Sequence, residues 1–392
     1  MISNIIEKDN TLILQVEGRI DTINSEPFEK ELSQAAASAN GRELLLDAQK
    51  LTYISSMGLR VLLSLRKKQP YRIINAIPEI YDIFHMTGFD KLIDIEKALR
   101  NLDVEGCEII GAGVNGTVYR LGADQIAKVY NEKVPLDYIK QEHDFAQAAF
   151  LSGVPTAISY DTVRCGDKYG IVFEMLNAST FAGKFHGHPD TFSHYAKLYA
   201  DTLKQVHNAK ADTNALPSAA DKYNGWIDQS GHLYSERERE LMHRMIDSVP
   251  KRDTTIHGDF HPKNIMVQGE EPLLVDMADV SYGHPIFDFA CSTLTHRIYP
   301  WLMPENTIHF MGVSADEITQ LWWLLLESYF GTSDKAELEE IDKHLMHYAL
   351  LRYALQPIVL PQTPEEDVQR TIRIVRERLF PVIEEISGKL FF

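Results

Sequence analysis

The segment IHGDFHPKNIMV, Ile256–Val267, places an aspartate between two histidines and follows them with a proline and an asparagine. His257 and His261 have the i, i+4 spacing with which one helix face offers two imidazoles to a zinc ion. Such a helix is not expected here, because Pro262 disfavours the α conformation at the residue before it and Gly258 adds a further penalty. The segment is therefore predicted to be a loop between two strands, and zinc hydrolysis is not favoured.

The same loop has a spacing suited to phosphate transfer. That reaction needs a cover for the phosphates, a cation, metal ligands and a carboxylate that orients the attacking hydroxyl. Asp259 is the candidate for this carboxylate. Asn264 follows five residues later, and Asp276 ends the apolar run PLLVD, so both offer oxygen ligands suited to Mg²⁺. Asp279 is a rival ligand, and capping of turns is the alternative role for each of these side chains.

Candidates for the cover of the phosphates and for the cation precede the loop in the sequence. The segment GAGVNGTVY supplies Gly111, Gly113, Gly116 and Val118. Glycine lets the backbone approach phosphates closely, although a hairpin turn that tolerates glycine gives the same pattern. Lys128 follows on the apolar strand IAKVY, where its burial costs free energy unless an anion meets it. The alternative is an edge-strand lysine that reaches water, and Glu142 on the next predicted helix is its candidate partner.

Composition excludes several classes of protein. The chain has 392 residues and a net charge of −17, which argues against a nucleic-acid binder because phosphate backbones would be repelled. Its three cysteines lie far apart without a C-x-x-C pattern, which fits a reducing compartment. No signal peptide is recognised, and the most apolar run, Leu321–Leu326, is too short to span a bilayer. A cytoplasmic protein without membrane contact is expected.

The acidic excess lies mostly beyond residue 104, where 26 Lys and Arg face 41 Asp and Glu. A cationic acceptor and a merely solubilising surface are the two interpretations of this excess. The elements change along the chain as well. Residues 1–102 alternate strand and helix signals and predict a small α/β domain. Residues 103–176 are rich in strand signals with one helix near Pro135–Leu151, and residues 177–392 are mostly helical, so an α/β plus α+β fold class is predicted.

Residues 105–392 resemble the protein-kinase-like phosphotransferases of small molecules, the aminoglycoside phosphotransferase and choline kinase group. HGDFHPKN and the later FDFA carry this resemblance. It implies a bilobal fold with a strand-rich N-lobe at 103–176 and a helical C-lobe at 177–392. It also implies ATP and Mg²⁺ as cofactors, Asp259 as catalytic base, Asn264 and Asp276 as metal ligands, and Asp288 as a structural anchor.

Two details refine this resemblance. His261 stands where protein kinases usually carry a phosphate-contacting lysine, which favours the small-molecule branch. By analogy with kinases, the backbone from Glu174 to Leu176 is expected to meet adenine. The chain departs from the kinase pattern at DMAD, Asp276–Asp279, which lacks the glycine of D-F-G. The segment KYNGWIDQSGHLY, Lys222–Tyr234, either lines a substrate site or covers the core.

Residues 1–102 resemble a STAS domain, the fold of bacterial anti-sigma-factor antagonists. VEGRIDT, LLLDAQKLTYISSMGLRVLL and GFDKLIDI carry the resemblance. Phosphorylatable members read D-S-x-G-L in the loop that here reads SSMGL, so Ser56 falls at the acceptor position and Ser55 replaces the aspartate. N-capping of the following helix by Ser56 is the alternative role. The resemblance implies a regulatory domain or one that binds a protein partner.

These observations lead to three hypotheses. The first is a phosphotransferase, dependent on ATP and Mg²⁺, that acts on a hydroxyl of a small molecule and carries a STAS domain for regulation or partner binding. The second is a protein-directed kinase that phosphorylates Ser56. The third is a signalling scaffold that binds nucleotide without turnover. The identity of the acceptor is not encoded in any motif of the chain.

Overall fold

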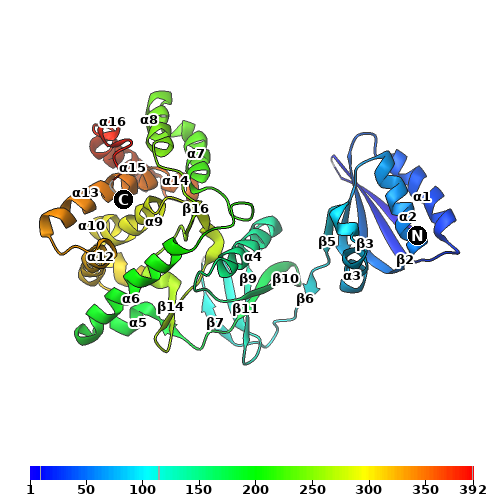
Figure 1. Ribbon diagram of the computed structural model, residues 1–392, viewed down its shortest axis with the longest axis horizontal. Coiled ribbons are helices and arrows are strands. Elements are labelled where there is room, and N and C mark those ends of the chain that lie inside the picture. Colours follow the sequence, from blue (N-terminus) through cyan, green and yellow to red (C-terminus); the bar gives the residue numbers. More distant parts are fainter. Residues whose placement is uncertain (9, 114, 391) are drawn as a thin grey trace. The chain divides into compact units, whose positions relative to one another are not determined.

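The computed structural model describes residues 1–8, 10–113, 115–390 and 392. The chain forms two compact units, Met1–Leu102 and Asp103–Phe392 (Figure 1). The first is an α/β unit, and the second begins with strands and continues with helices, which is the fold class that the sequence predicts. Among the described residues, no helix is long and apolar enough to cross a membrane.

The first unit is built on a sheet of order β1-β2-β3-β4-β5, in which only β1 runs antiparallel to its neighbour. Its strands are β1 (Ile2–Lys8), β2 (Thr11–Ile20), β3 (Glu43–Ile54), β4 (Arg72–Ala76) and β5 (Ile95–Lys97), and the short β6 (Arg100–Asn101) lies outside this sheet. Its helices are α1 (Ser25–Ala37), α2 (Ser56–Lys68), α3 (Pro78–Met86) and the 3-10 turn η1 (Phe89–Lys91). Alternating burial along β2 shows which face of the strand packs in the core. Leu12, Leu14 and Val16 are buried, while the residues between them are partly exposed.

The start of α2 corrects one expectation. The N-cap of this helix is Ser55, whose side chain accepts a hydrogen bond from the backbone N–H of Gly58 at 3.3 Å. Ser56 is the first residue of the helix and is exposed, so its hydroxyl is not the cap. The prediction that Ser56 caps the helix is therefore wrong by one position, because the cap residue must keep an extended backbone and Ser55 has it.

The second unit opens with an antiparallel sheet of order β10-β11-β9-β8-β7. Its strands are β7 (Ile109–Ala112), β8 (Gly116–Arg120), β9 (Gln125–Tyr130), β10 (Ser159–Cys165) and β11 (Lys168–Glu174). The helix α4 (Leu136–Leu151) connects β9 to β10. Because β9 lies between β8 and β11, Lys128 sits on an inner strand, and the edge-strand interpretation of this lysine is wrong.

The rest of the second unit is mainly helical, with two small sheets of order β12-β14-β15 and β13-β16. The strands are β12 (Ser179–Thr180), β13 (Thr254–Ile256), β14 (Ile265–Gln268), β15 (Glu271–Leu274) and β16 (Ser281–Gly283). The longer helices are α6 (Pro189–Asn208), α7 (Ala219–Gln229), α8 (Glu236–Asp247), α9 (Ile286–Thr293), α12 (Ala315–Phe330), α13 (Lys335–Ala354) and α15 (Glu365–Arg378). The shorter ones are α5 (Phe181–Phe185), η2 (Ser230–His232), η3 (Pro262–Asn264), η4 (Met277–Asp279), the π-helical η5 (Leu294–Ile298), α10 (Tyr299–Leu302), α11 (Pro304–Met311), α14 (Gln356–Val359) and α16 (Ile383–Ile386).

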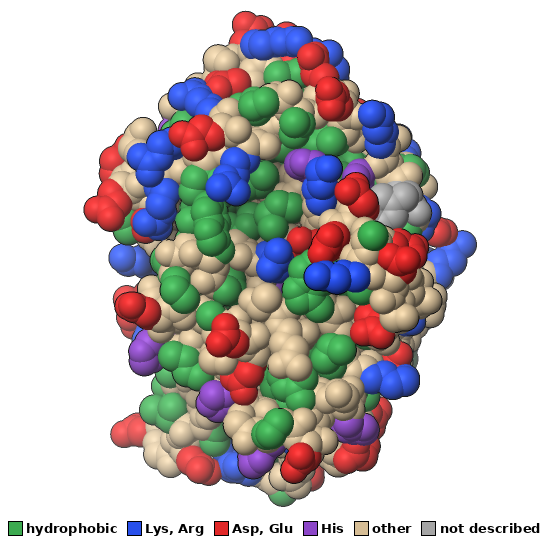
Figure 2. Space-filling model, turned by 90° about the vertical axis from the view of Figure 1, so that its left-hand side faces the viewer, with side chains coloured by type: hydrophobic (Ala, Val, Ile, Leu, Met, Phe, Trp, Pro, Cys, Tyr) green, Lys and Arg blue, Asp and Glu red, His purple; other side chains and the backbone are tan. Residues whose placement is uncertain are grey.

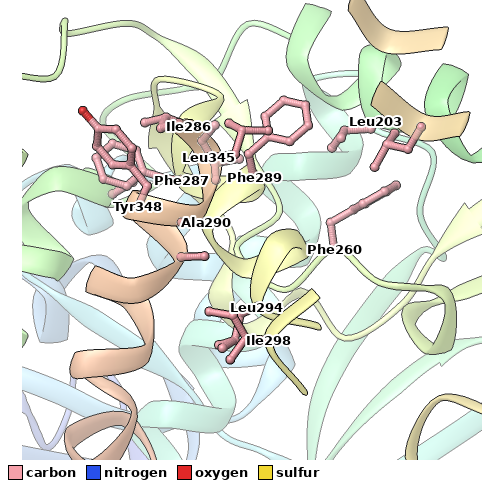
Figure 3. Close-up of a cluster of buried hydrophobic side chains, with 14 of the residues drawn as sticks. Leu203, Phe260, Ile286, Phe287, Phe289, Ala290, Leu294, Ile298, Leu345 and Tyr348 are labelled. Atoms are coloured by element: carbon pink, nitrogen blue, oxygen red, sulfur yellow. The ribbon is translucent and has the colours of Figure 1, made fainter. Parts of the chain in front are cut away.

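Helix α9 forms the centre of the helical core, since all eight of its residues are buried. Figure 3 shows its side chains Phe287 and Phe289 packed among side chains of neighbouring elements, with Leu345 and Tyr348 of α13 close by. Phe260 reaches the same core from the loop after β13 and packs on Tyr199, with ring centroids 4.7 Å apart. The loop that carries Asp259 is therefore fixed by an aromatic anchor beside it.

A buried histidine in η5 makes the stability of this core depend on pH. His296 is fully buried between Tyr199, 3.1 Å from its Nε2, and the carbonyl of Ser292, 2.7 Å from its Nδ1. Burial lowers the pKa of His296 from its usual 6.5 to about 3, although the hydrogen bond to Ser292 opposes this shift. Between these values the unfolded chain binds the proton and the folded chain does not, so stability falls as pH falls below 6.5.

We expect this histidine to account for roughly 2 kcal/mol of the stability lost between about pH 7.5 and about pH 5. His296→Gln should reduce the pH-dependent loss by that amount, measured as the free energy of unfolding in urea at both pH values. The exposed His232 provides the matched control, and His232→Gln should leave the loss as in the wild type. An unchanged pH dependence in His296→Gln would contradict the assignment.

Candidate functional site

The segment between β13 and β14 is a loop and not a helix, as Pro262 predicts. His261 has an extended backbone and η3 begins at Pro262. Gly258 has a φ of +83°, and a Cβ atom there would lie 2.5 Å from the carbonyl oxygen of Asp279. Only glycine fits both demands, so this residue lets the loop pack directly against the segment after β15.

Asp259 is held by three side chains. Asn264 Nδ2 donates to its Oδ2 at 3.0 Å, His261 Nε2 lies 3.3 Å from the same oxygen, and the Cys291 thiol donates to Oδ1 at 3.3 Å. Burial works to raise the pKa of Asp259, but His261, His257 and the Cys291 hydrogen bond outweigh it and hold the pKa below its usual range. The carboxylate therefore stays ionised at neutral pH and keeps a fixed direction.

The backbone of the loop is clamped by Asp288 of α9. This fully buried carboxylate accepts hydrogen bonds from the N–H groups of His257 at 2.9 Å and Gly258 at 2.6 Å. Its Oδ2 also lies 3.0 Å from Nε2 of His207, whose Nδ1 meets the hydroxyl of Tyr329 at 2.7 Å. A carboxylate buried this deeply needs such partners, so Asp288 and His207 serve the position of the loop.

Asn264 and Asp276 lie on the wall of one cavity, together with Lys128. Asn264 uses its amide N–H group on Asp259, which leaves its carbonyl oxygen as a ligand atom. Asp276 is half exposed and has a φ of +62°, a conformation that is uncommon outside glycine and that turns up at functional sites. Two hard oxygen donors on the wall of one cavity fit Mg²⁺, which takes few protein ligands and completes its shell with phosphate oxygens and water.

Two alternatives for metal binding, by Asp279 and by the two histidines of the loop, are not supported by the contacts of these residues. Asp279, the rival ligand, is held by Lys222, whose ammonium group lies 3.1 Å from Oδ1 and donates to the backbone carbonyl at 3.0 Å. Within the described ranges, no cluster of three or more His, Cys, Asp or Glu side chains is arranged to hold a metal ion. His257 and His261 serve the aspartate between them, as their contacts with it indicate.

Lys128 points from β9 towards α4. Its Nζ lies 2.7 Å from Oε1 of Glu142 and 3.2 Å from Oδ1 of Asp276. Burial would lower the pKa of Lys128, but the two carboxylates outweigh it and raise the pKa above its usual value. The buried Glu142 thus keeps a charged ammonium group next to the cavity, a position suited to anionic phosphates.

The cavity itself has a volume of about 480 Å³. Gly111, Val118, Lys128, Glu142, Glu174, Leu176, Asn264 and Asp276 all line it. The N–H groups of Glu174 and Met175 already donate to the carbonyls of Ile158 and Asp124, at 2.9 Å each. The N–H of Leu176 makes no backbone hydrogen bond in the described part of the chain, so it is the donor that this segment offers to a ligand.

The glycines of the glycine-rich turn differ in whether the packing of the strands requires them. Gly113 and Gly116 do not line the cavity, and the N–H of Gly113 donates to the carbonyl of Gly116 at 2.9 Å. A Cβ at Gly116 would lie 2.3 Å from the carbonyl oxygen of Val129, whereas one at Gly113 would meet no described atom within 4 Å. Gly116 is therefore required by the packing of β8 on β9, and residue 114 of this turn lies outside the described residues.

The structure brings together most residues singled out from the sequence, and adds others. Asp259 contacts Asn264, Lys128 contacts Glu142 and Asp276, and these two groups meet on the wall of one cavity through Asn264 and Asp276. The contacts of His261 and Cys291 with Asp259 were not foreseen. The sequence marks His261 only by its place in the motif, and Cys291 carries no signal at all, because it meets Asp259 from a helix 32 residues later.

Comparison with known proteins shows the families to which parts of the chain are similar. Residues 106–304, just over half of the chain, match the phosphotransferase enzyme family, and the chain therefore belongs to that family. Residues 3–102 match the STAS domain. The chain is 35% identical over 86 residues to the putative anti-sigma factor antagonist BtrV of Bordetella bronchiseptica, a stretch that covers 21% of this chain and 73% of that protein. Both resemblances inferred from the sequence are confirmed.

Solved structures of similar proteins share little sequence with the chain. A choline/ethanolamine kinase family protein from Mesorhizobium loti is 14% identical, with a TM-score of 0.47 over 72% of this chain and 92% of that one. The ternary complex of streptomycin, ATP and APH(2")-IIa is 16% identical, with a TM-score of 0.45 over 77% of this chain and 96% of that one.

The two glycines allow a test of which position the fold requires. Gly116→Ala should cost about 1–3 kcal/mol of stability, because the new methyl group overlaps the backbone of β9. Gly113→Ala, at an exposed position with free space, should stay within about 0.5 kcal/mol of the wild type. Chemical denaturation of both variants measures the difference, and equal losses would refute it.

Proposed function

We propose that the chain transfers the γ-phosphoryl group of ATP to a hydroxyl group of a small molecule, with Mg²⁺ as the metal cofactor. The observation that carries this proposal is the contact set around one cavity. Asp259 is hydrogen-bonded to Asn264, Asn264 shares a cavity wall with Asp276, and Asp276 contacts the Lys128–Glu142 pair. Membership of the phosphotransferase enzyme family supports the same reaction.

In this reaction the hydroxyl oxygen of the acceptor forms a bond to the γ-phosphorus of ATP. The bond from that phosphorus to the bridging oxygen breaks, and its electron pair leaves with ADP. The hydroxyl proton passes to the carboxylate of Asp259. A carboxylate with a lowered pKa is a weak base, so its main contribution is to orient the hydroxyl before the proton moves. Asn264, His261 and Cys291 hold it in one direction for this purpose.

The remaining groups would bind the nucleotide. The ammonium group of Lys128, kept charged by Glu142, would meet the phosphates. The carbonyl oxygen of Asn264 and the carboxylate of Asp276 would hold Mg²⁺, which when bound neutralises charge on the phosphate oxygens. The apolar side chains around the cavity and the N–H of Leu176 are suited to adenine.

Replacement of Asp259 tests the proposal. Asp259→Asn should lower kcat about 10²- to 10⁴-fold, because the amide no longer accepts the proton. The measurement is ADP release over a panel of hydroxyl compounds. Binding of a non-hydrolysable ATP analogue with Mg²⁺, followed by calorimetry, should be retained and controls for folding. Unchanged turnover in the variant would refute the role of Asp259, and a wild-type protein that binds nucleotide without turnover would favour a scaffold.

A second candidate function involves the STAS domain, for which we propose a regulatory or partner-binding role. Ser55 supplies the cap of α2, so the exposed hydroxyl of Ser56 is free for another role, and it lies at the first residue of a helix. Phosphate at that place would be stabilised by the helix N-terminus. The protein would then be a kinase that phosphorylates Ser56 in its own chain or in another copy.

Intact-mass spectrometry after incubation with ATP and Mg²⁺ distinguishes this second function. Phosphorylation of Ser56 should add the mass of one phosphate group, and Ser56→Ala should abolish the addition. Ser55→Ala is the matched control: it loses a cap worth about 1 kcal/mol but keeps the acceptor hydroxyl. If the wild type gains no mass, or if Ser56→Ala still gains it, phosphorylation at this serine is rejected.

A further inference from the structure

A second cavity of about 430 Å³ opens in the helical part of the second unit. Aromatic and aliphatic side chains form much of its wall, among them Tyr299, Met303, Phe310, Tyr353 and Leu360. Several uncharged polar side chains, such as Gln356, stand between them. A concave, mainly apolar space with a few polar groups is the usual form of a site for a small molecule.

This cavity adjoins the loop of Asp259. Phe310 lies on its wall, with its ring centroid 6.2 Å from the ring of His261 and 4.7 Å from Nζ of Lys263. Lys263 also lines the first cavity, so the contact between Lys263 and Phe310 separates the two spaces. From another side, Thr295 lies on the wall and donates to the carbonyl of Cys291, whose thiol contacts Asp259. Asp259 itself lines neither cavity, and these two series of contacts connect it to the wall of the second one.

The charged side chains on the wall of the second cavity neutralise each other. Asp367 and Arg370 are the charged side chains among its described residues, and they form an ion pair with an N–O distance of 2.5 Å. A cationic acceptor would need carboxylates that are free to pair with its amines, because desolvating an unpaired charge is costly. The wall offers none within the described ranges, so the space suits a molecule without charge.

Several of the charged side chains around these elements are cationic. Lys263 lies against Phe310, and Lys222 neutralises Asp279. Arg352, which is 9% exposed, packs on Trp226 with its Cζ 5.1 Å from the ring centroid, and its Nη1 has no hydrogen-bond partner in the described part of the chain. Lys222 is balanced by Asp279, so Lys263 and Arg352 are the cations that would offset the attraction of the ionised Asp259 for an ammonium group.

The face of the molecule drawn in Figure 2 does not reverse this pattern. On the face drawn in Figure 2, Lys and Arg side chains are interleaved with Asp and Glu side chains, and hydrophobic side chains gather between them. The net charge of −17 therefore does not form a continuous acidic field on that face. This observation supports the solubilising interpretation of the acidic excess over the one that connects it with a cationic acceptor.

We propose that the second cavity receives the phosphate acceptor, and that this acceptor is an uncharged alcohol with a largely apolar body. The proposal rests on the phosphotransferase function proposed above and names its substrate class. The apolar body packs on Phe310, Tyr299 and Tyr353, uncharged polar groups of the wall bind its other oxygens, and its reacting hydroxyl lies at the Asp259 end.

Binding of three sets of hydroxyl compounds to the full-length protein tests the substrate class. Aryl glucosides represent uncharged alcohols with an apolar body, kanamycin and streptomycin represent cations, and glycerate and pantoate represent anions. Calorimetry with and without a non-hydrolysable ATP analogue should show binding of the aryl glucosides at least about tenfold tighter than of either charged set. Tighter binding of the cations or the anions, or no binding of the aryl glucosides, would overturn the proposal.

Variants place the binding in this cavity. Phe310→Ala should weaken binding of the aryl glucosides about tenfold, through loss of an aromatic surface. Trp301→Ala is the matched control, because this exposed tryptophan packs on Arg378 and does not line the cavity. Gln356→Glu adds one carboxylate of nearly equal size and should improve binding of kanamycin by about tenfold. An equal effect of Phe310→Ala and Trp301→Ala, or no gain of kanamycin binding in Gln356→Glu, would contradict the location.

Acceptor binding is measured without turnover, so failure of the acceptor proposal can be distinguished from failure of the proposed function. Loss of nucleotide binding would count against the phosphotransferase proposal alone. Retained nucleotide binding together with preferred binding of a charged acceptor would count against the uncharged class alone. Competition between an aryl glucoside and kanamycin in the wild type gives the preference in one experiment.

Discussion

The site depends on a carboxylate that does no chemistry in the proposed reaction. Asp288 is fully buried in α9 and accepts hydrogen bonds from two successive N–H groups of the loop, those of His257 and Gly258. Removing this clamp would leave one buried and one part-buried donor without partners, and the loop would lose its fixed path. The neighbouring contacts add to it, because Phe260 is packed in the core and its carbonyl accepts from Ser292 at 2.8 Å. Asp259 is rigid because its chain neighbours are.

The aspartates around the loop have different roles because their surroundings differ. Asp288 is surrounded by donors and serves the backbone, whereas Asp279 is neutralised by Lys222. Asp259 keeps a lowered pKa and a fixed direction, and Asp276 is half exposed on the wall of a cavity. Four aspartates within 30 residues of sequence therefore have four environments, and two of them are suited to the proposed reaction and its proposed metal.

The sequence anticipated the elements and much of the proposed site. Alternating burial in β2 and the apolar face of α2 follow from local periodicity. Gly258 and Pro262 disfavour a helix, so the sequence places Asp259 and Asn264 on a short loop. The capping of α2 was misjudged by one residue, because two adjacent serines offer the same side chain and only the backbone conformation chooses between them. Lys128 was similarly ambiguous until its strand was placed inside the sheet.

What the sequence determined by itself is thus the order of the elements, the two domain families and the set of candidate polar residues. The tertiary structure alone decided which of them meet. Lys128 and Asp276 are 148 residues apart in sequence, and Cys291 reaches Asp259 from a helix with no motif of its own. The second cavity is walled by elements spread from η5 to α15, and its charge balance depends on a pairing of Asp367 with Arg370. Local patterns record the conformation of a segment, whereas long-range contacts depend on how the segments pack, which no short stretch of sequence contains.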